Sequence, residues 1–141
     1  MGLTLVDASV AIAVLYADDA HHEAAVAAVR HESLARQTIA FSAVTWTEVL
    51  TGLRILRRDP AAVERLAGEV AMVLPVDRAA AERAALLRAE QQRRRRARLA
   101  TPDAIVLGTA ATHPQIDRVL TADAQWGRIR LDGVDIEIVA A

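Results

Sequence analysis

Short runs of Leu, Val and Ile alternate with helix-forming segments along the whole sequence, and this alternation limits the possible folds more than any other feature. The apolar runs predict strands at residues 3–6, 37–41, 72–76, 118–121 and 135–139. The remaining periodic segments predict helices at about residues 10–16, 21–30, 43–57, 60–71, 78–96 and 101–112. Strands that alternate with helices build a layered α/β domain, so we expect a mainly parallel sheet with helices on its faces.

Capping residues support the starts of these helices. A side-chain oxygen just before a helix can accept a hydrogen bond from its first turn, and the residues so placed are Ser42, Asp59 and Asp77. Pro60 and Pro102 stand at the expected first positions of their helices, where a missing N–H does little harm. We assign Thr101 as the cap of the helix at 101–112.

The composition excludes several classes of protein. All 17 basic residues are Arg, so the chain has no P-loop lysine and no Schiff-base lysine. The absence of Cys excludes disulfides, zinc ribbons, iron–sulfur clusters and thiol nucleophiles. With 141 residues, of which 53% are hydrophobic, the chain has enough apolar material for one core. We therefore expect a single domain over residues 1–141.

The chain shows no sign of a membrane protein. Its longest apolar stretch, residues 8–17, is shorter than the roughly 20 residues that a bilayer-spanning helix needs. The residues before this stretch carry no basic side chain, so we expect no secretory signal peptide. The formal net charge of -1 by itself indicates neither a nucleic acid nor a membrane as partner. We expect a cytoplasmic protein without a membrane partner.

Two acidic residues stand at or near the ends of predicted strands. Asp7 follows the strand at 3–6 directly, and Asp123 comes two residues after the strand at 118–121. In a parallel sheet the functional crevice lies beyond the carboxyl ends of the strands, so both are candidate site residues. For each of them a simple N-cap role is the alternative.

Two further acids stand within predicted helices. Asp103 is the one charged residue in the segment 103–112, and it shares a helix face with Val106 and Leu107. We expect it to point inward or into a cleft with a positive group nearby, because burying an unpaired carboxylate is costly. Glu48 lies opposite the main apolar stripe of its helix, between apolar residues; an exposed surface acid is the alternative.

The order and spacing of these acids resemble those of the PIN domains, and within them the VapC-type toxin ribonucleases of bacterial and archaeal toxin–antitoxin pairs. The resemblance covers nearly the whole chain. The segments that carry it are Leu5-Val6-Asp7-Ala8-Ser9, Thr47-Glu48, Pro102-Asp103-Ala104-Ile105-Val106-Leu107-Gly108-Thr109-Ala110 and Leu120-Thr121-Ala122-Asp123-Ala124-Gln125-Trp126. Leu107-Gly108 and Trp126 stand where the family more often has small Ala residues and a Phe, and we interpret both as variation in packing.

The resemblance implies a compact three-layer α/β/α sandwich in which Asp7, Glu48, Asp103 and Asp123 gather at one edge of the sheet. Four carboxylates so close together would repel one another unless a divalent cation lay among them. Oxygen ligands alone suit Mg²⁺ or Mn²⁺ rather than zinc. We therefore expect these four acids to be metal ligands.

Such a metal site can activate a water and stabilise a leaving oxyanion, which describes phosphodiester hydrolysis. We expect a metal-dependent endoribonuclease acting on RNA, with the same four acids as its catalytic residues. Ser9 and Thr121 belong to the family motifs and would orient the carboxylates or a metal-bound water.

A run of arginines before Asp103 is a candidate RNA-binding element. Its members are Arg93, Arg94, Arg95, Arg96 and Arg98. Guanidinium groups match phosphate geometry well, and in the implied fold the run approaches the acidic crevice. A solvated helix end, where basic side chains complement the helix dipole, is the alternative.

The resemblance also implies protein partners: a small antitoxin that blocks the site, and a second copy of the chain, so that a homodimer or a toxin–antitoxin hetero-oligomer is expected. Two other functions stay open. A non-catalytic PIN-fold interaction module would keep the same fold. A haloacid-dehalogenase-like phosphatase also begins with a strand and an Asp, but it needs a second Asp where Ser9 stands and a downstream Lys.

Overall fold

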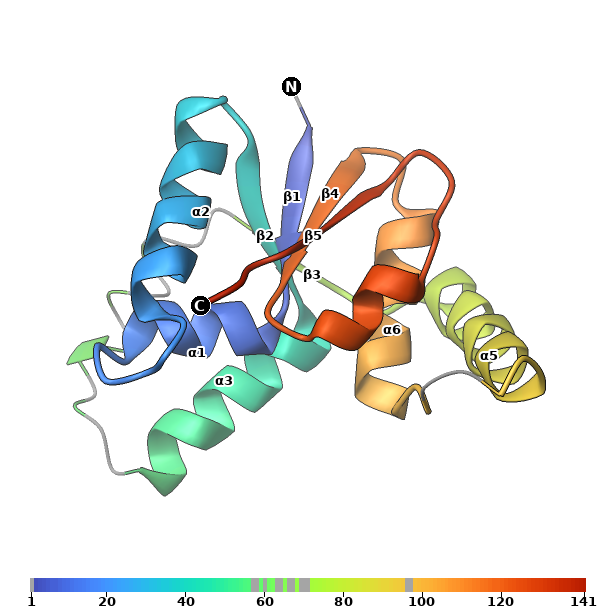
Figure 1. Cartoon of the computed structure of the whole chain (residues 1–141), viewed down its shortest axis with the longest axis horizontal. Helices are drawn as coiled ribbons and strands as arrows, with labels where there is room; N and C mark the ends of the chain where they lie inside the picture. Colours follow the sequence, from blue (N-terminus) through green and yellow to red (C-terminus); the bar gives the residue numbers. More distant parts are fainter. Residues whose placement is uncertain are drawn as a thin grey trace.

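The computed structural model describes residues 2–56, 59, 61–62, 65, 68, 72–95 and 98–141. Within them the chain forms the strands and helices that are labelled in Figure 1. The strands are β1 (Leu3–Val6), β2 (Thr38–Ser42), β3 (Met72–Leu74), β4 (Ile116–Thr121) and β5 (Asp135–Ile138). The helices are α1 (Ala8–Leu15), α2 (His22–Leu34), α3 (Ala43–Ile55), α5 (Arg78–Arg93), α6 (Thr101–Thr112) and the 3₁₀ helix η1 (Ala124–Arg128).

The strands make one sheet in the order β3-β2-β1-β4-β5, and every neighbouring pair is parallel. In the centre of the sheet, Leu5 of β1 is in register with Ala40 of β2 and with Val119 of β4. From β1 the chain builds first toward β2 and β3 and later, on the other side of β1, toward β4 and β5. The strand order therefore reverses between β1 and β4, which is where open α/β sheets bind their ligands.

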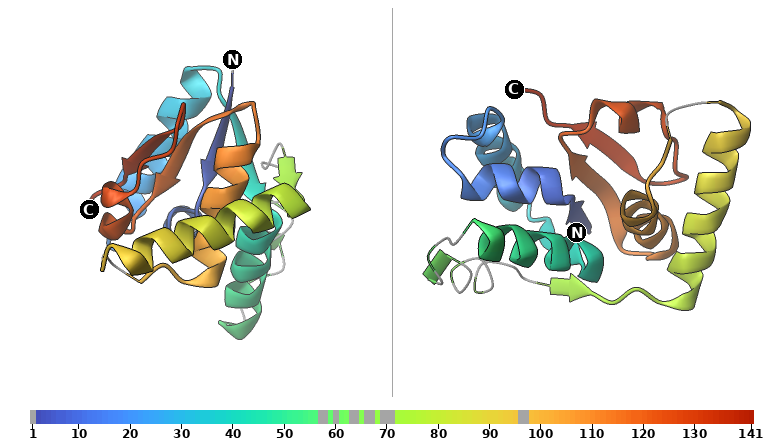
Figure 2. Two further views of the ribbon diagram at one scale, coloured as in Figure 1. Left: turned by 90° about the vertical axis from the view of Figure 1, so that its right-hand side faces the viewer. Right: turned by 90° about the horizontal axis from the view of Figure 1, so that it is seen from below.

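Helices cover both faces of the sheet and divide the core into two parts (Figure 2). Leu5 of β1 packs on the face that carries α5, α6 and η1. Val6, the next residue, packs with Phe41 on the face that carries α1, α2 and α3. Successive residues of a strand point to opposite faces, so each strand contributes to both parts of the core. The predicted three-layer α/β/α sandwich with a parallel sheet is confirmed.

The predicted elements agree with this structure, with differences at their ends. Helix α2 continues to Leu34, four residues beyond the predicted end, and α5 ends at Arg93 rather than at 96. The Ser42 Oγ accepts hydrogen bonds from the first turn of α3, and Asp77 Oδ1 accepts one from the Ala80 N–H at 2.8 Å. Asp59 caps in the same way, but most of the helix predicted at 60–71 lies outside the described residues.

The prediction that Thr101 caps α6 is wrong. Thr101 is itself the first residue of this helix, and Ala100 holds the cap position without any side-chain capping bond. Pro102 accordingly stands one position further into the helix than predicted. A side-chain cap is less necessary here because Pro102 has no N–H that needs an acceptor in the first turn.

Within the described residues, no helix is long and apolar enough to span a membrane. The apolar stretch at residues 8–17 forms most of α1 instead. Val10 and Ala13 are completely buried there against the sheet and neighbouring helices, which accounts for the apolar character of this stretch.

Gly108 allows α5 and α6 to approach each other closely. A Cβ at this position would clash with the backbone oxygen of Ala80 and would lie 2.9 Å from the backbone nitrogen of Ala84. Both of these atoms belong to the α5 backbone, which cannot rotate out of the way as a side chain would. The packing of α5 against α6 therefore requires a glycine at position 108 in this chain.

We expect Gly108→Ala to lower the free energy of unfolding by about 1–3 kcal/mol, because the added methyl group forces the two helices apart. Gly52→Ala is the matched control, since Gly52 lies in α3 with no atom near its missing Cβ. That control should be neutral or stabilising by up to about 1 kcal/mol, because alanine favours helix more than glycine does. Urea unfolding of both variants measures the difference, and an equal effect of the two would disprove the packing argument.

Candidate functional site

The four candidate acids lie around the carboxyl ends of the central strands. Asp7 follows β1 directly, and Asp123 follows β4 after one intervening residue. Ser42 ends β2 and caps α3, which carries Glu48 in its second turn. Asp103 lies in the first turn of α6. The site therefore draws on two strand ends and two helices, at the reversal between β1 and β4.

Asp7 is the most buried of these acids, with 6% of its surface exposed. It holds the N-cap position of α1, where the backbone N–H groups of Ala8 and Ser9 also interact with its carboxylate. Its Oδ2 accepts hydrogen bonds from Ser9 Oγ at 2.8 Å and from Thr121 Oγ1 at 3.0 Å. Its Oδ1 has no hydrogen-bond partner among the side chains that the structure describes.

Ser9 and Thr121 connect Asp7 to the loop after β4. Ser9 Oγ accepts a hydrogen bond from the Ala122 N–H at 3.0 Å, and Thr121 Oγ1 accepts one from the Asp123 N–H at 3.1 Å. Because each hydroxyl donates to Asp7 and accepts from this loop, it fixes the carboxylate relative to the backbone that carries Asp123. The structure thus brings both hydroxyls into contact with Asp7.

Asp123 has a capping role in addition to its place in the cluster. Its Oδ1 accepts a hydrogen bond from the Gln125 N–H at 2.9 Å, at the start of η1. The capping alternative is therefore correct for one oxygen of this residue. The other carboxylate oxygen makes no hydrogen bond within the described part of the chain.

Charge repulsion and burial shift the pKa values of three of the four acids upward. Burial, followed by the charges of Asp7, Asp123 and Glu48, raises the pKa of Asp103 from 3.8 to about 6. Burial, and then the charge of Asp7, raises the pKa of Glu48. Burial also raises the pKa of Asp7, against the opposing hydrogen bonds from its two hydroxyl partners. The four carboxylates consequently act as one electrostatically coupled cluster.

The positive group expected beside Asp103 does not form an ion pair with it among the described residues. Burial raises the pKa of Asp103 most, and the charges of the other three acids raise it further. Arg98 and Arg128 line the same hollow as Asp103 and Asp123.

The chemistry of this cluster fits a hard divalent cation. Its donors are carboxylate oxygens, and one oxygen of Asp123 has no hydrogen bond in the described part of the chain. Within the described residues, however, no three acidic or imidazole side chains are already arranged to hold a metal ion. Mutual repulsion keeps uncompensated carboxylates apart, and Mg²⁺ retains several waters and needs only one or two direct carboxylate ligands. The donor set therefore fits such a cation, although it is not closed into a ligand shell.

A small hollow of about 50 Å³ adjoins two of the acids. The residues that line it are Gln91, Arg98, Leu99, Asp103, Asp123, Gln125, Trp126, Arg128 and Ile129. Trp126 is 1% exposed, and its indole N–H has no hydrogen-bond partner among the described residues. Sequence reasoning missed Arg128 and Gln91, because neither belongs to a motif and their positions follow only from the folding of η1 and α5 beside α6.

The members of the predicted arginine run have different surroundings. Arg94 forms an ion pair with Glu90 at 2.8 Å on the surface of α5, which fits the solvated helix-end alternative. Arg93 and Arg95 are exposed, and Arg96 lies outside the described residues. Only Arg98, among the members that the structure describes, lines the small hollow together with Asp103 and Asp123.

The coupled cluster predicts how stability changes with pH in metal-free protein. Folded Asp103 keeps its proton up to about pH 6, whereas the unfolded chain loses it near 3.8. The folded state thus binds more protons in this window, so stability should fall as the pH rises from about 4 to about 7. Asp103→Asn should lack the pH-dependent stability that Asp103 contributes. Urea unfolding midpoints of the parent chain and of Asp103→Asn, measured in EDTA between about pH 4 and 7, test this. A difference between the two chains that does not change with pH would contradict the coupling.

A family model described as PIN domain matches residues 4–131 of this chain. No curated protein matches it at a significant level. The residues matched by the family model include β2, β3, β4, most of β1 and all four candidate acids, but not β5.

Several solved structures have a similar fold. VapBC2 from Rickettsia felis, bound to a DNA fragment of its promoter, is similar with a TM-score of 0.75 and 11% identity over 96% of this chain and 97% of that chain. VapC20 from Mycobacterium tuberculosis, a toxin that cleaves the sarcin–ricin loop, is similar with a TM-score of 0.70 and 20% identity over 94% and 98%. FitAB, bound to a DNA fragment, is similar with a TM-score of 0.70 and 22% identity over 96% and 94%.

Proposed function

Because this chain belongs to the PIN domain family, we propose that it is the toxin of a toxin–antitoxin pair and acts as a metal-dependent endoribonuclease. The observation that carries the proposal is the coupled cluster of Asp7, Glu48, Asp103 and Asp123 at the carboxyl edge of the sheet. The similar fold of VapC20, a toxin that cleaves the sarcin–ricin loop, supports RNA as the substrate class.

The proposed cofactor is Mg²⁺ or Mn²⁺, held by the carboxylates of these four acids. When bound, such a cation would neutralise their charge, activate a water and stabilise the leaving oxyanion of the RNA. Ser9 and Thr121 hold Oδ2 of Asp7 in place by hydrogen bonds. The raised pKa of Asp103, about 6, belongs to the metal-free cluster, and a bound cation would lower it by offsetting the charges of the other acids.

The proposed partners are RNA, a cognate antitoxin and a second copy of the chain. The relatives in fold include VapBC and FitAB complexes, and this supports an antitoxin partner. Large exposed apolar side chains offer surface that a protein partner could cover: Leu34 and Leu86 are 78% and 62% exposed, and Ile55 is 73% exposed. We place these interactions in the cytoplasm, where an RNA-cleaving toxin would meet its substrate.

The proposal is tested by incubating the purified full chain with structured cellular RNA in Mn²⁺, in Mg²⁺ and in EDTA. We expect discrete cleavage products with either cation and none in EDTA. Expression should also arrest growth, and co-expression of the neighbouring open reading frame should relieve the arrest. RNA that remains intact under all conditions, with a protein that still binds its antitoxin, would favour the non-catalytic interaction module instead.

A further inference from the structure

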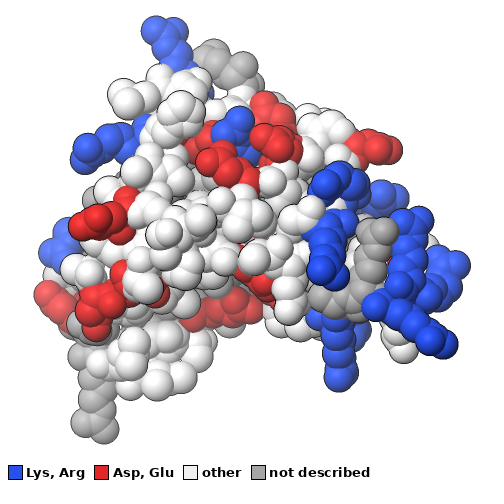
Figure 3. All heavy atoms as spheres, viewed as in Figure 1, with Lys and Arg blue, Asp and Glu red and all other residues white. Residues whose placement is uncertain are grey.

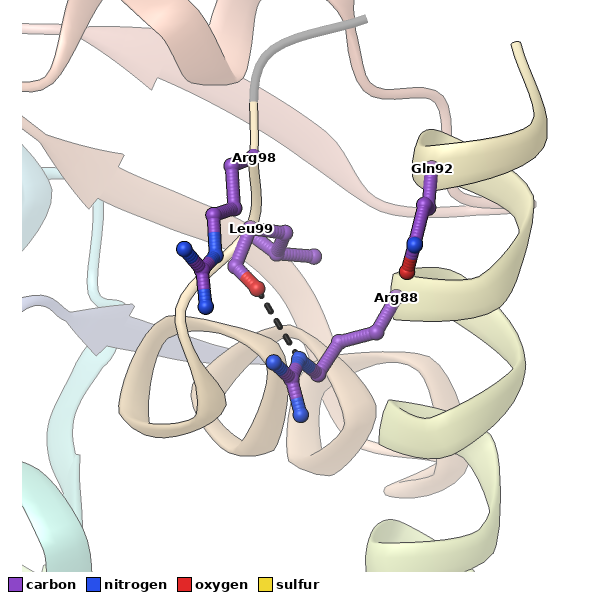
Figure 4. A pocket seen from close by; sticks show the side chains of 4 residues that line it. All are labelled: Arg88, Gln92, Arg98 and Leu99. Carbon is purple, nitrogen blue, oxygen red and sulfur yellow. Dashed lines mark hydrogen bonds between the residues drawn. The ribbon is translucent and has the colours of Figure 1, made fainter. Parts of the chain in front are cut away.

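A larger hollow lies between α5 and the segment that leads into α6. Its volume is about 450 Å³, and it is lined by Arg88, Gln92, Arg98 and Leu99 (Figure 4). Two of these residues come from α5 and two from the segment before α6, so the hollow exists only because the two elements pack side by side. We call it the arginine hollow. None of the described residues that line it is acidic.

The two arginines of this hollow keep free donors. The Arg88 Nε donates a hydrogen bond to the Leu99 carbonyl oxygen at 3.0 Å, which leaves both of its terminal nitrogens without a partner among the described residues. Arg98 makes no hydrogen bond or ion pair within the described part of the chain. By contrast, Arg78 and Arg118 are paired with carboxylates. The arginine hollow therefore presents guanidinium groups that can bind an external anion.

The arginine hollow adjoins the acidic cluster. Arg98 and Leu99 line both this hollow and the small hollow that contains Asp103 and Asp123. Arg128 also lines the small hollow, so that the two hollows together are bordered by Arg88, Arg98 and Arg128. On the face shown in Figure 3, basic side chains gather at the right, on the side where Figure 1 shows α5. A strand whose reacting phosphate lay at the acids would therefore have its next phosphates beside arginines.

We infer that the arginine hollow is a phosphate-binding subsite for the RNA strand next to the bond that is cut, with Arg98 as a direct contact. This inference rests on the proposed function. A strand of RNA approaching four carboxylates is repelled by them, and guanidinium groups beside the site offset this repulsion at the flanking phosphates. The volume is within the range of pockets that take a small organic ligand, so a nucleotide fits it.

Arg88 also has a positioning role in this subsite. Its hydrogen bond to Leu99 holds the segment that carries Arg98 against α5, as Figure 4 shows. The two arginines therefore differ as targets for substitution. Arg98→Gln removes a free guanidinium without breaking any bond among the described residues, whereas Arg88→Gln also releases the segment. Arg98 is for this reason the cleaner test.

The test measures binding of the full chain in EDTA to a fluorescein-labelled single-stranded RNA of mixed sequence, by anisotropy at several salt concentrations. Arg98→Gln should weaken binding several-fold and should reduce the slope of log K against log salt by about 0.7, the value for one lost phosphate contact on a single strand. Arg83→Gln is the matched control, because Arg83 lies on α5 near the arginine hollow's helix wall, is exposed and lines neither hollow. It should leave the slope unchanged.

Two results would overturn the inference. One is an unchanged salt slope in Arg98→Gln, or an equal change in Arg98→Gln and Arg83→Gln. The other is an oligoglutamate peptide of the same net charge that binds the parent chain more tightly than the RNA does and loses this binding in Arg98→Gln. That result would assign the hollow to an acidic protein partner.

Cleavage in Mn²⁺ separates this inference from the proposed function: Arg98→Gln should raise KM and leave kcat unchanged. If the parent chain cut no RNA but bound it through Arg98, the proposed activity would fail and the subsite would stand.

Discussion

Replacing Asp7 by Asn is expected to abolish metal-dependent RNA cleavage and to leave the metal-free protein at least as stable as the parent chain. Asn keeps a carbonyl oxygen that can accept the hydrogen bonds of Ser9 and Thr121, so the local structure should survive. It removes a buried charge whose pKa burial raises, and this relieves both desolvation and repulsion within the cluster. Loss of a cation ligand should lower the cleavage rate by at least about 100-fold, since the cation contributes several kcal/mol and each 1.4 kcal/mol is about tenfold.

The cleavage rate of Asp7→Asn is measured in Mn²⁺, and its stability is measured by thermal unfolding in EDTA. Asp132→Asn serves as the control, because Asp132 is an exposed acid that lines neither hollow. It should change neither quantity. A less stable Asp7→Asn chain would mean that the carboxylate has a structural role that outweighs its burial, and undiminished cleavage would remove Asp7 from the site.

The second large effect is expected at the opposite end of the sheet. Glu32 of α2 is 2% exposed, accepts a hydrogen bond from Thr4 Oγ1 at 2.7 Å and pairs with Arg118 Nη1 at 2.8 Å. Arg118 also binds Glu137 of β5 at 2.7 Å. Arg118→Met would leave the buried Glu32 carboxylate without its cation, which should cost about 3–5 kcal/mol of unfolding free energy.

The design of this test includes a rescue and a control. Adding Glu32→Gln to Arg118→Met removes the unpaired charge and should recover most of the loss. Arg78→Met is the control, because Arg78 forms an exposed ion pair with Glu82 that contributes less than about 1 kcal/mol. Urea unfolding at neutral pH compares the four chains. Equal losses for Arg118→Met and Arg78→Met would show that burial of Glu32 has no energetic consequence.

The acids of the site could be predicted from sequence because local patterns determine where they stand. Asp7 and Asp123 follow strands whose apolar runs are easy to recognise, and parallel strands bring their carboxyl ends to one edge. Asp103 was expected to point into a cleft because its helix has no other charge. What surrounds Asp103 could not be predicted in this way, since it depends on how three other elements approach α6.

Contacts between distant elements account for most of what sequence reasoning missed. Arg118 and Glu32 are 86 residues apart, and no periodicity relates them. Arg88 meets Leu99 because α5 packs beside the segment before α6, and α5 approaches α6 itself closely at Gly108, whose presence was interpreted as simple variation in packing. Thr101 was assigned as a cap from residue type alone, and the actual start of α6 one residue earlier corrected it. Tertiary packing therefore determines these features, and local propensity does not.

The most direct test of the central claim is an isothermal calorimetric titration of Mn²⁺ into the parent chain and into Asp103→Asn. If Asp7, Glu48, Asp103 and Asp123 form one cation site, the parent chain should bind Mn²⁺ saturably and Asp103→Asn should bind it at least about tenfold more weakly. Equal affinity of the two chains for Mn²⁺, or no binding by either, would contradict the claim that these carboxylates act together on a metal ion.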